Sequence, residues 1–94
     1  MREASTGPIA TEMRRRLEAA LQPTVLALSD DSEQHRGHGG YNPAGESHFS
    51  LVIESPAFAG TTRVERRRMV HAALGDLLKE RVHALSITAR EPQP

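Results

Sequence analysis

The sequence predicts a single α+β domain in which helices cover one face of a three-stranded mixed sheet. The chain has 94 residues, a length that suits one domain. Segments with helical and strand periodicity follow one another in the order helix, strand, strand, helix, strand. Because each predicted helix has one apolar stripe and each predicted strand has one apolar face, a two-layer sandwich buries all of these surfaces together.

The first predicted helix begins at Gly7-Pro8 and ends before Pro23, after a flexible N-terminus of residues 1–6. Proline suits the first helical turn because its missing N–H has no helical partner there, whereas the residue before a proline is disfavoured in a helix. The apolar residues at helical spacing between these two points should face the sheet: Ile9, Met13, Leu17, Ala20 and Leu21.

Two predicted strands follow, over residues 24–29 and residues 47–54. The first strand places Leu26 and Leu28 on one face. Residues 30–45 between the strands are polar or glycine-rich, and connections longer than about 12–15 residues are usually functional or disordered. In the second strand, the apolar face alternates with a polar face that is expected to be wet: Phe49, Leu51 and Ile53 against His48, Ser50, Val52 and Glu54.

A capping box of Thr62 and Glu65 predicts that the next helix begins at Arg63, after a connector of residues 56–60. Its apolar stripe comprises Val70, Ala73, Leu74, Leu77 and Leu78. Gly75 lies inside this pattern, so one long helix and two consecutive helices both remain open.

The last predicted strand, residues 84–90, turns Leu85, Ile87 and Ala89 inward. A helical connection of this length permits parallel pairing with the preceding strand. The domain should therefore extend over residues 7–90, and residues 91–94 should form a C-terminal tail.

The composition excludes several classes of function. Twelve basic and twelve acidic residues balance, which argues against a globally basic nucleic-acid binder but leaves room for a local basic patch. The absence of cysteine excludes disulfides, a thiol nucleophile and a self-contained iron–sulfur site. No apolar run approaches the roughly 18 residues of a membrane span, and no secretory leader is evident, so we expect no membrane partner and a cytoplasmic location. With no catalytic constellation or cofactor fingerprint in the sequence, we expect a protein that is not an enzyme.

Three histidines are candidate metal ligands. His35 and His38 lie three residues apart in the polar segment, and His83 lies at the junction of the last helix and strand. Imidazole is a common ligand of zinc, copper and iron. The alternative is that the first two are solvated and His83 donates one structural hydrogen bond. A structural zinc site needs four ligands, and nothing at zinc-finger spacing supplies the remainder.

A cluster of four arginines, Arg63, Arg66, Arg67 and Arg68, occupies the first two turns of the second helix with only Glu65 opposing it. Cations at a helix N-terminus oppose its dipole by about 0.3–1 kcal/mol each, so helix stability does not explain them. They suit an acidic partner, a phosphate or an anionic thiol; the alternative is a solvated face.

The element order is similar to that of a KH domain of class II type, and residues 37–40 spell the G-x-x-G string of such domains. In KH domains that loop joins two helices, whereas here the string lies between two predicted strands. The match to the G-x-x-G string is therefore misplaced.

Taken together, the segments resemble the BolA family across roughly residues 12–92. Five stretches in register carry the resemblance: Asp30-Asp31-Ser32, Gly45-Glu46-Ser47-His48-Phe49, Phe58-Ala59-Gly60, residues 63–70 and His83-Ala84-Leu85-Ser86-Ile87. One departure is that the family usually has Arg-His-Arg where this chain has Arg66-Arg67-Arg68.

The resemblance implies a partner, a cytosolic monothiol glutaredoxin with a CGFS active site, and a heterodimer that bridges a 2Fe–2S cluster. Glutaredoxin and a bound glutathione would supply thiolates, and this chain would supply histidine. Alone, the chain is expected to be an apo monomer or a weak homodimer. The function implied is that of an adaptor in iron–sulfur trafficking and iron homeostasis.

Residue by residue, His83 matches the family's C-terminal ligand in its His-Ala-Leu context. His35 has the family's usual offset after Asp-x-Ser, and His38 belongs to the His-x-Gly-His form of the loop, so either could be the second ligand; we favour His35. His48 and His71 are interpreted as structural.

BolA-like proteins are also described as DNA-binding transcriptional regulators of stress and morphology. In that alternative a helix–turn–helix would span residues 63–82, and its arginines would meet the phosphates of duplex DNA. Zero net charge weakens this interpretation, although a local patch suffices for modest affinity. The sequence does not say which role operates in the cell, nor the direction of cluster transfer.

Overall fold

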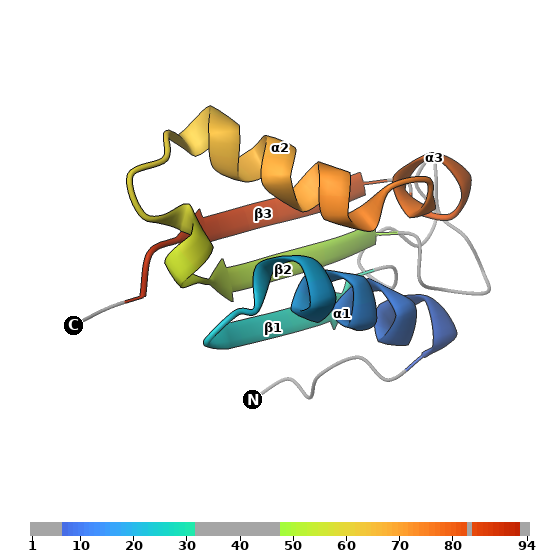
Figure 1. Cartoon of the computed structure of the whole chain (residues 1–94). Coiled ribbons are helices and arrows are strands. Elements are labelled where there is room, and N and C mark those ends of the chain that lie inside the picture. Colours follow the sequence, from blue (N-terminus) through green and yellow to red (C-terminus); the bar gives the residue numbers. More distant parts are fainter. Residues whose placement is uncertain (1–6, 32–47, 83, 93–94) are drawn as a thin grey trace.

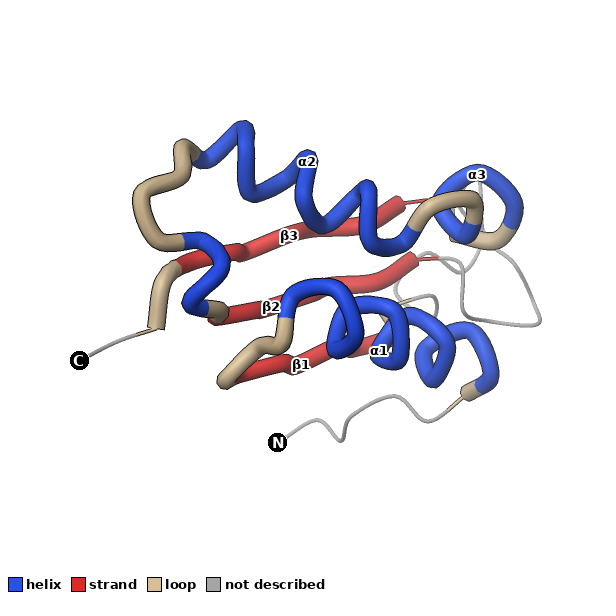
Figure 2. Tube along the Cα trace, in the orientation of Figure 1, coloured by secondary structure: helices blue, strands red, loops and turns tan. Residues whose placement is uncertain are grey.

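The computed structural model describes residues 7–31, 48–82 and 84–92. A sheet with strand order β1-β2-β3 lies beneath a layer of helices (Figures 1 and 2). β1 pairs antiparallel with β2, and β2 pairs parallel with β3, so the mixed α+β sandwich is confirmed. The elements in chain order are α1 (Pro8–Leu21), β1 (Val25–Asp30), β2 (His48–Glu54), a 3₁₀ helix (Pro56–Phe58), α2 (Arg63–Leu74), α3 (Leu77–Glu80) and β3 (Ala84–Arg90). Among the helices of the described ranges, none has the length and apolar character needed to cross a membrane.

Helix α1 begins at Pro8 as predicted and ends with Gln22 in the left-handed conformation at φ 47°. The amide of Gln22 donates to the carbonyl of Glu18 at 3.1 Å, which closes the last turn. The predicted stripe is confirmed except at one position: Ala20 is exposed, and Ala10 is fully buried in its place. Position 10 lies near the centre of the face that carries Leu17, whereas position 20 lies at its margin with a side chain too short to reach the sheet.

The face of β2 toward the helices carries the centre of the core. Phe49, Leu51 and Ile53 are at most 2% exposed, as the alternation predicted. The opposite face is less wet than expected, because His48 and Glu54 are each only 7% exposed. β2 is the central strand, so side chains of β1 and β3 flank it on both sides, and the carboxylate of Glu54 accepts a hydrogen bond from Arg90 Nε at 2.7 Å.

The connector after β2 is more ordered than its sequence indicated. Ser55 is fully buried; its hydroxyl donates to the carbonyl of Leu21 and accepts from the amide of Ala57. The 3₁₀ helix that follows buries Phe58 completely in the core. Gly60 then adopts φ 73°, a left-handed conformation that favours glycine, and the chain turns toward α2.

The predicted capping box at the start of α2 is present. The amide of Glu65 donates to Thr62 Oγ1 at 3.1 Å, and the amide of Thr62 donates to Glu65 Oε1 at 2.7 Å. Gly75, at φ 58°, ends α2 and separates it from α3, so the two-helix alternative is the correct one. Val70 and Leu74 are buried, and Ala73, Leu77 and Leu78 are half-buried against the core.

Arg16 joins the two long helices. Its Nη1 donates to the carbonyl of Leu74 at 2.7 Å and to Asp76 Oδ1 at 3.0 Å, and its Nε donates to Glu12 Oε2 at 2.7 Å. Hydrogen bonds from Arg15 and Arg16 lower the pKa of Glu12 to about 2. The last carbonyl of α2 is thus capped by a side chain of α1.

This network predicts an acid-dependent loss of stability. The pKa of Glu12 is about 2 in the folded chain against an ordinary value of 4.5, so its contribution to stability is fully present above pH 4.5 and is lost as the pH falls through about 2. We expect Glu12→Gln to lower the melting temperature at pH 6 and to lower it much less at pH 2, measured by far-UV circular dichroism. Glu18→Gln, on the exposed side of the same helix, is the control; an equal effect of both variants would contradict the prediction.

Candidate functional site

The three candidate ligands His35, His38 and His83 lie outside the described residues, but their chain neighbours do not. The segment 32–47 connects Asp31 to His48, and these two residues are joined by a hydrogen bond from the Asp31 amide to the His48 carbonyl at 2.6 Å. His48 in turn pairs with Ala84, which directly follows position 83. Both ends of the segment and the start of β3 therefore meet at one end of the sheet.

Asp31 secures this end of the sheet. Its carboxylate accepts hydrogen bonds from Ser29 Oγ at 3.1 Å and from Ser50 Oγ, which ties β1 to β2 where the segment departs. Within the described ranges, no group of three or more histidine and acidic side chains is arranged to hold a metal ion. His48 is buried, consistent with the structural role assigned to it, whereas His71 is exposed on α2 and takes no part in the core.

The four arginines of the predicted cluster divide into different roles. Arg66 is part of the fold: its side chain is only 19% exposed and donates to Thr61 Oγ1 at 2.9 Å, to the Thr61 carbonyl at 3.2 Å and to the Ala89 carbonyl at 3.4 Å. It also forms an ion pair with Glu91 at 3.4 Å. Arg66 thereby fastens α2 to β3 rather than offering its charge to solvent.

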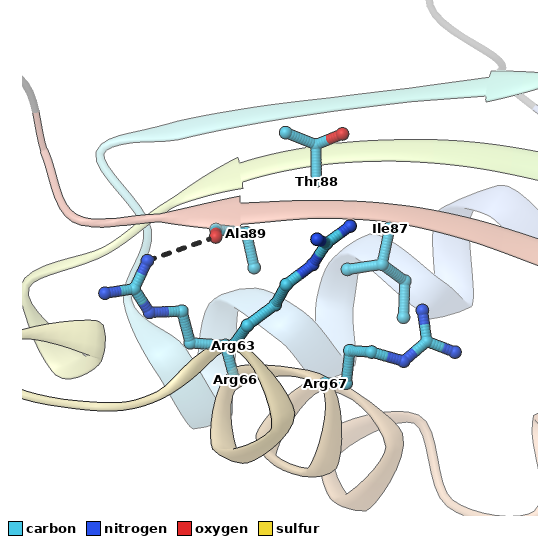
Figure 3. Close-up of a pocket in the computed structure, with 6 residues that line it drawn as sticks. All are labelled: Arg63, Arg66, Arg67, Ile87, Thr88 and Ala89. Carbon is cyan, nitrogen blue, oxygen red and sulfur yellow. Dashed lines mark hydrogen bonds between the residues drawn. The ribbon is translucent and has the colours of Figure 1, made fainter.

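The remaining arginines leave positive charge available. Arg63 and Arg67 make no hydrogen bond or ion pair with any residue that the structure describes, and both reach from α2 toward β3 (Figure 3). Arg68 lies outside the pocket, beside Glu65, whose pKa is lowered chiefly by the hydrogen bonds of the capping box and to a smaller extent by Arg68. Arg63 and Arg67 line a pocket of about 260 Å³ together with Arg66, Ile87, Thr88 and Ala89.

The strand side of this pocket was absent from the sequence prediction. Ile87 and Ala89 were assigned to the core alone, yet both are only half-buried and contribute an apolar wall beneath the guanidinium groups. The sequence did offer one indication of this wall, namely the predicted helical connection between parallel strands. A helix that joins two parallel strands packs beside the second strand, so residues of that strand lie next to the arginines.

The divided roles predict different effects on stability. Arg66→Ala removes four hydrogen bonds from a mostly buried guanidinium and leaves the Ala89 carbonyl without this partner, so we expect the free energy of unfolding to fall by roughly 1–3 kcal/mol. Arg67→Ala, one residue further on and exposed, should change it by less than about 0.5 kcal/mol. Urea unfolding followed by circular dichroism measures both; similar losses would contradict the division.

Comparisons with known proteins show which family this chain resembles. A family model described as "BolA-like protein" matches residues 17–94. BolA-like protein 1 of Homo sapiens is 42% identical over 86 residues, which cover 92% of this chain and 60% of that protein, so this chain spans about three fifths of its length. DNA-binding transcriptional regulator BolA of Escherichia coli is 38% identical over 80 residues, covering 84% of this chain and 71% of that protein. Among solved structures, the BolA domain of SufE1 from Arabidopsis thaliana has a TM-score of 0.82 and 42% identity, covering 94% of this chain and 96% of that one.

Proposed function

Since this chain belongs to the BolA family, we propose that it is an adaptor that binds a monothiol CGFS glutaredoxin and shares a bridging 2Fe–2S cluster with it. The arrangement at one end of the sheet supports this most directly. There β1 ends before the segment that contains His35 and His38, and β3 begins directly after His83. Connectivity thus brings both candidate ligand segments to one edge of the domain.

The donor chemistry of the chain fits half of a cluster site. The sequence has five histidines and no cysteine, so it can contribute imidazole but no thiolate. A 2Fe–2S cluster takes four ligands, and two histidines can replace two cysteines, which raises the reduction potential. His83 and one histidine of the segment would hold the cluster on this side, and the partner and glutathione would hold it on the other.

A domain similar to this one forms part of a larger protein, SufE1, and other relatives are named as BolA-like proteins or as a regulator. An accessory role beside a second protein agrees with that arrangement. It also agrees with Arg63 and Arg67, whose unpaired charges offer a second, cluster-independent contact for an acidic partner.

The test is to titrate the chain into cluster-loaded CGFS glutaredoxin and record visible circular dichroism. We expect a new spectrum for the wild type and its loss for His83→Ala, with His71→Ala, exposed on α2, behaving as wild type. An unchanged spectrum, or an unchanged response with His83→Ala, would refute the shared cluster. Ligation requires neutral imidazole, so acidification should also dissociate the bridged complex.

A second candidate is DNA-binding regulation, which the name of the Escherichia coli relative and the exposed arginines favour. Arg66 is engaged within the fold, so at most three of the four arginines can neutralise phosphates through their free head groups. The expected affinity for duplex DNA is accordingly modest and steeply dependent on salt. No measurable binding at low ionic strength, or binding that Arg63→Glu/Arg67→Glu leaves intact, would remove this candidate.

A further inference from the structure

Within residues 7–31, 48–82 and 84–92, no strand pairs with the outer edge of β3. β3 is the last strand of the sheet, and one of its sides faces β2. On that side the Arg90 carbonyl accepts from the Ser55 amide at 3.2 Å, whereas the Ala89 carbonyl, on the outer side, accepts from Arg66 at 3.4 Å. Because successive residues of a strand direct their main-chain groups to opposite sides, the N–H and C=O groups of Leu85 and Ile87 point to the outer edge as well.

Beside this edge lie the two unpaired arginines. Figure 1 shows α2 running along β3, and Figure 3 shows Arg63 and Arg67 extending from α2 toward the strand around Ile87. Among the described residues, the pocket therefore combines main-chain groups of Ile87 that pair with no strand, an apolar wall from Ile87 and Ala89, and two positive charges.

We propose that the outer edge of β3 binds an extended acidic polypeptide, which adds a fourth strand to the sheet and places two carboxylates on Arg63 and Arg67. Adding a strand to an open edge is a common mode of peptide recognition, in which main-chain hydrogen bonds supply affinity and side-chain pockets supply specificity. Arg66 limits the site at one end, because it already occupies the Ala89 carbonyl.

The spacing of the arginines defines the peptide. Four residues of a helix advance about 6 Å along its axis. Two residues of a strand advance about 6.6 Å, and their side chains lie on the same face. Acidic residues separated by one other residue therefore match Arg63 and Arg67, and the residue between them points to the opposite face of the sheet.

Other occupants fit less well. A sugar–phosphate backbone or a small anion such as phosphate would neutralise the arginines but has no repeating N–H groups to pair with the exposed carbonyls of a strand. A second copy paired edge to edge would bring Arg63 and Arg67 of the two chains together, and like charges placed opposite each other destabilise a sheet.

The test uses the full chain labelled with ¹⁵N and a peptide, acetyl-Thr-Glu-Val-Glu-Val-Thr-amide. We expect slower hydrogen exchange at the amides of Leu85 and Ile87, with no change at Leu26 and Leu28 in β1. The chain variant Arg63→Gln/Arg67→Gln, and a peptide with glutamine for both glutamates, should each weaken binding at least tenfold. Of two peptides N-methylated at alternate residues, only one should still bind, because only one set of amides faces β3.

Several outcomes would overturn the proposal. Equal binding of both N-methylated peptides would show charge attraction without strand pairing. Inorganic phosphate or a single-stranded oligonucleotide that protects the same amides as fully would assign the pocket to phosphate groups. Binding that survives in Arg63→Gln/Arg67→Gln, or the absence of peptide binding at millimolar concentration, would exclude the acidic peptide. None of these results depends on a shared cluster.

Discussion

Replacement of Phe58 by alanine is expected to lower the free energy of unfolding by about 3–5 kcal/mol. The side chain of Phe58 is fully buried and heads the set of large, completely enclosed side chains in the core. It comes from the short 3₁₀ helix between β2 and α2, which Ser55 fixes to the end of α1. The substitution would leave a cavity that this hydrogen-bonded segment cannot readily collapse to fill.

Urea or thermal unfolding followed by circular dichroism measures this loss. Val64→Ala is the matched control, because Val64 is 55% exposed in the first turn of α2 and should change stability by less than about 0.5 kcal/mol. If Phe58→Ala lowered the free energy of unfolding no more than Val64→Ala does, Phe58 would not be packed in the core as described.

The elements that could be predicted from sequence are those with local signals. The capping box of Thr62 and Glu65 depends on residues three apart, and the alternation in residues 84–90 is visible within a single strand. Gly75 also gave a local signal, but the sequence did not settle whether one helix or two spans this region. The energetic cost of glycine in a helix is small, so tertiary contacts determine whether the helix breaks there. Those contacts include the Arg16 hydrogen bond to the Leu74 carbonyl.

The features that the sequence did not predict involve burial of side chains by parts of the chain that are distant in sequence. Phe58 lies in a stretch too short to show periodicity, and nothing nearby indicates that it enters the core. His48 was assigned to a wet face because its neighbours alternate, but a central strand shields both of its faces. Ala20 has the helical spacing of the apolar stripe, yet it is exposed. The spacing shows which side of the helix faces the sheet, but it does not show how far the sheet extends beneath that side.

The arginine cluster shows the same limit at the candidate site. Its composition correctly indicated a basic helix start, yet the four residues were indistinguishable in sequence. The partners that single out Arg66 include Ala89 and Glu91, which follow it by 23 and 25 positions. Which arginines remain available, and the strand edge beside them, therefore emerge only when α2 and β3 are packed together.

The histidines of the segment after β1 provide the most discriminating prediction for the shared cluster. In titrations of cluster-loaded CGFS glutaredoxin, we expect His35→Ala to weaken formation of the bridged species by about 10–100-fold or more. Losing a group that only hydrogen-bonds to a metal ligand already costs roughly that much affinity, and a direct ligand should cost no less. His38→Ala should behave as wild type, because one imidazole from this segment and His83 complete the two positions that the chain can offer.

The visible circular dichroism amplitude measures this difference, and retained binding of apo-glutaredoxin by each variant separates lost ligation from lost docking. If His38→Ala alone abolished the signal, the ligand assignment within the segment would be reversed while the shared cluster remained. If both single variants kept the signal and His35→Ala/His38→Ala lost it, either imidazole could serve. Should the double variant keep it as well, the segment would supply no ligand, and the meeting of its ends with β3 would be a feature of the fold alone.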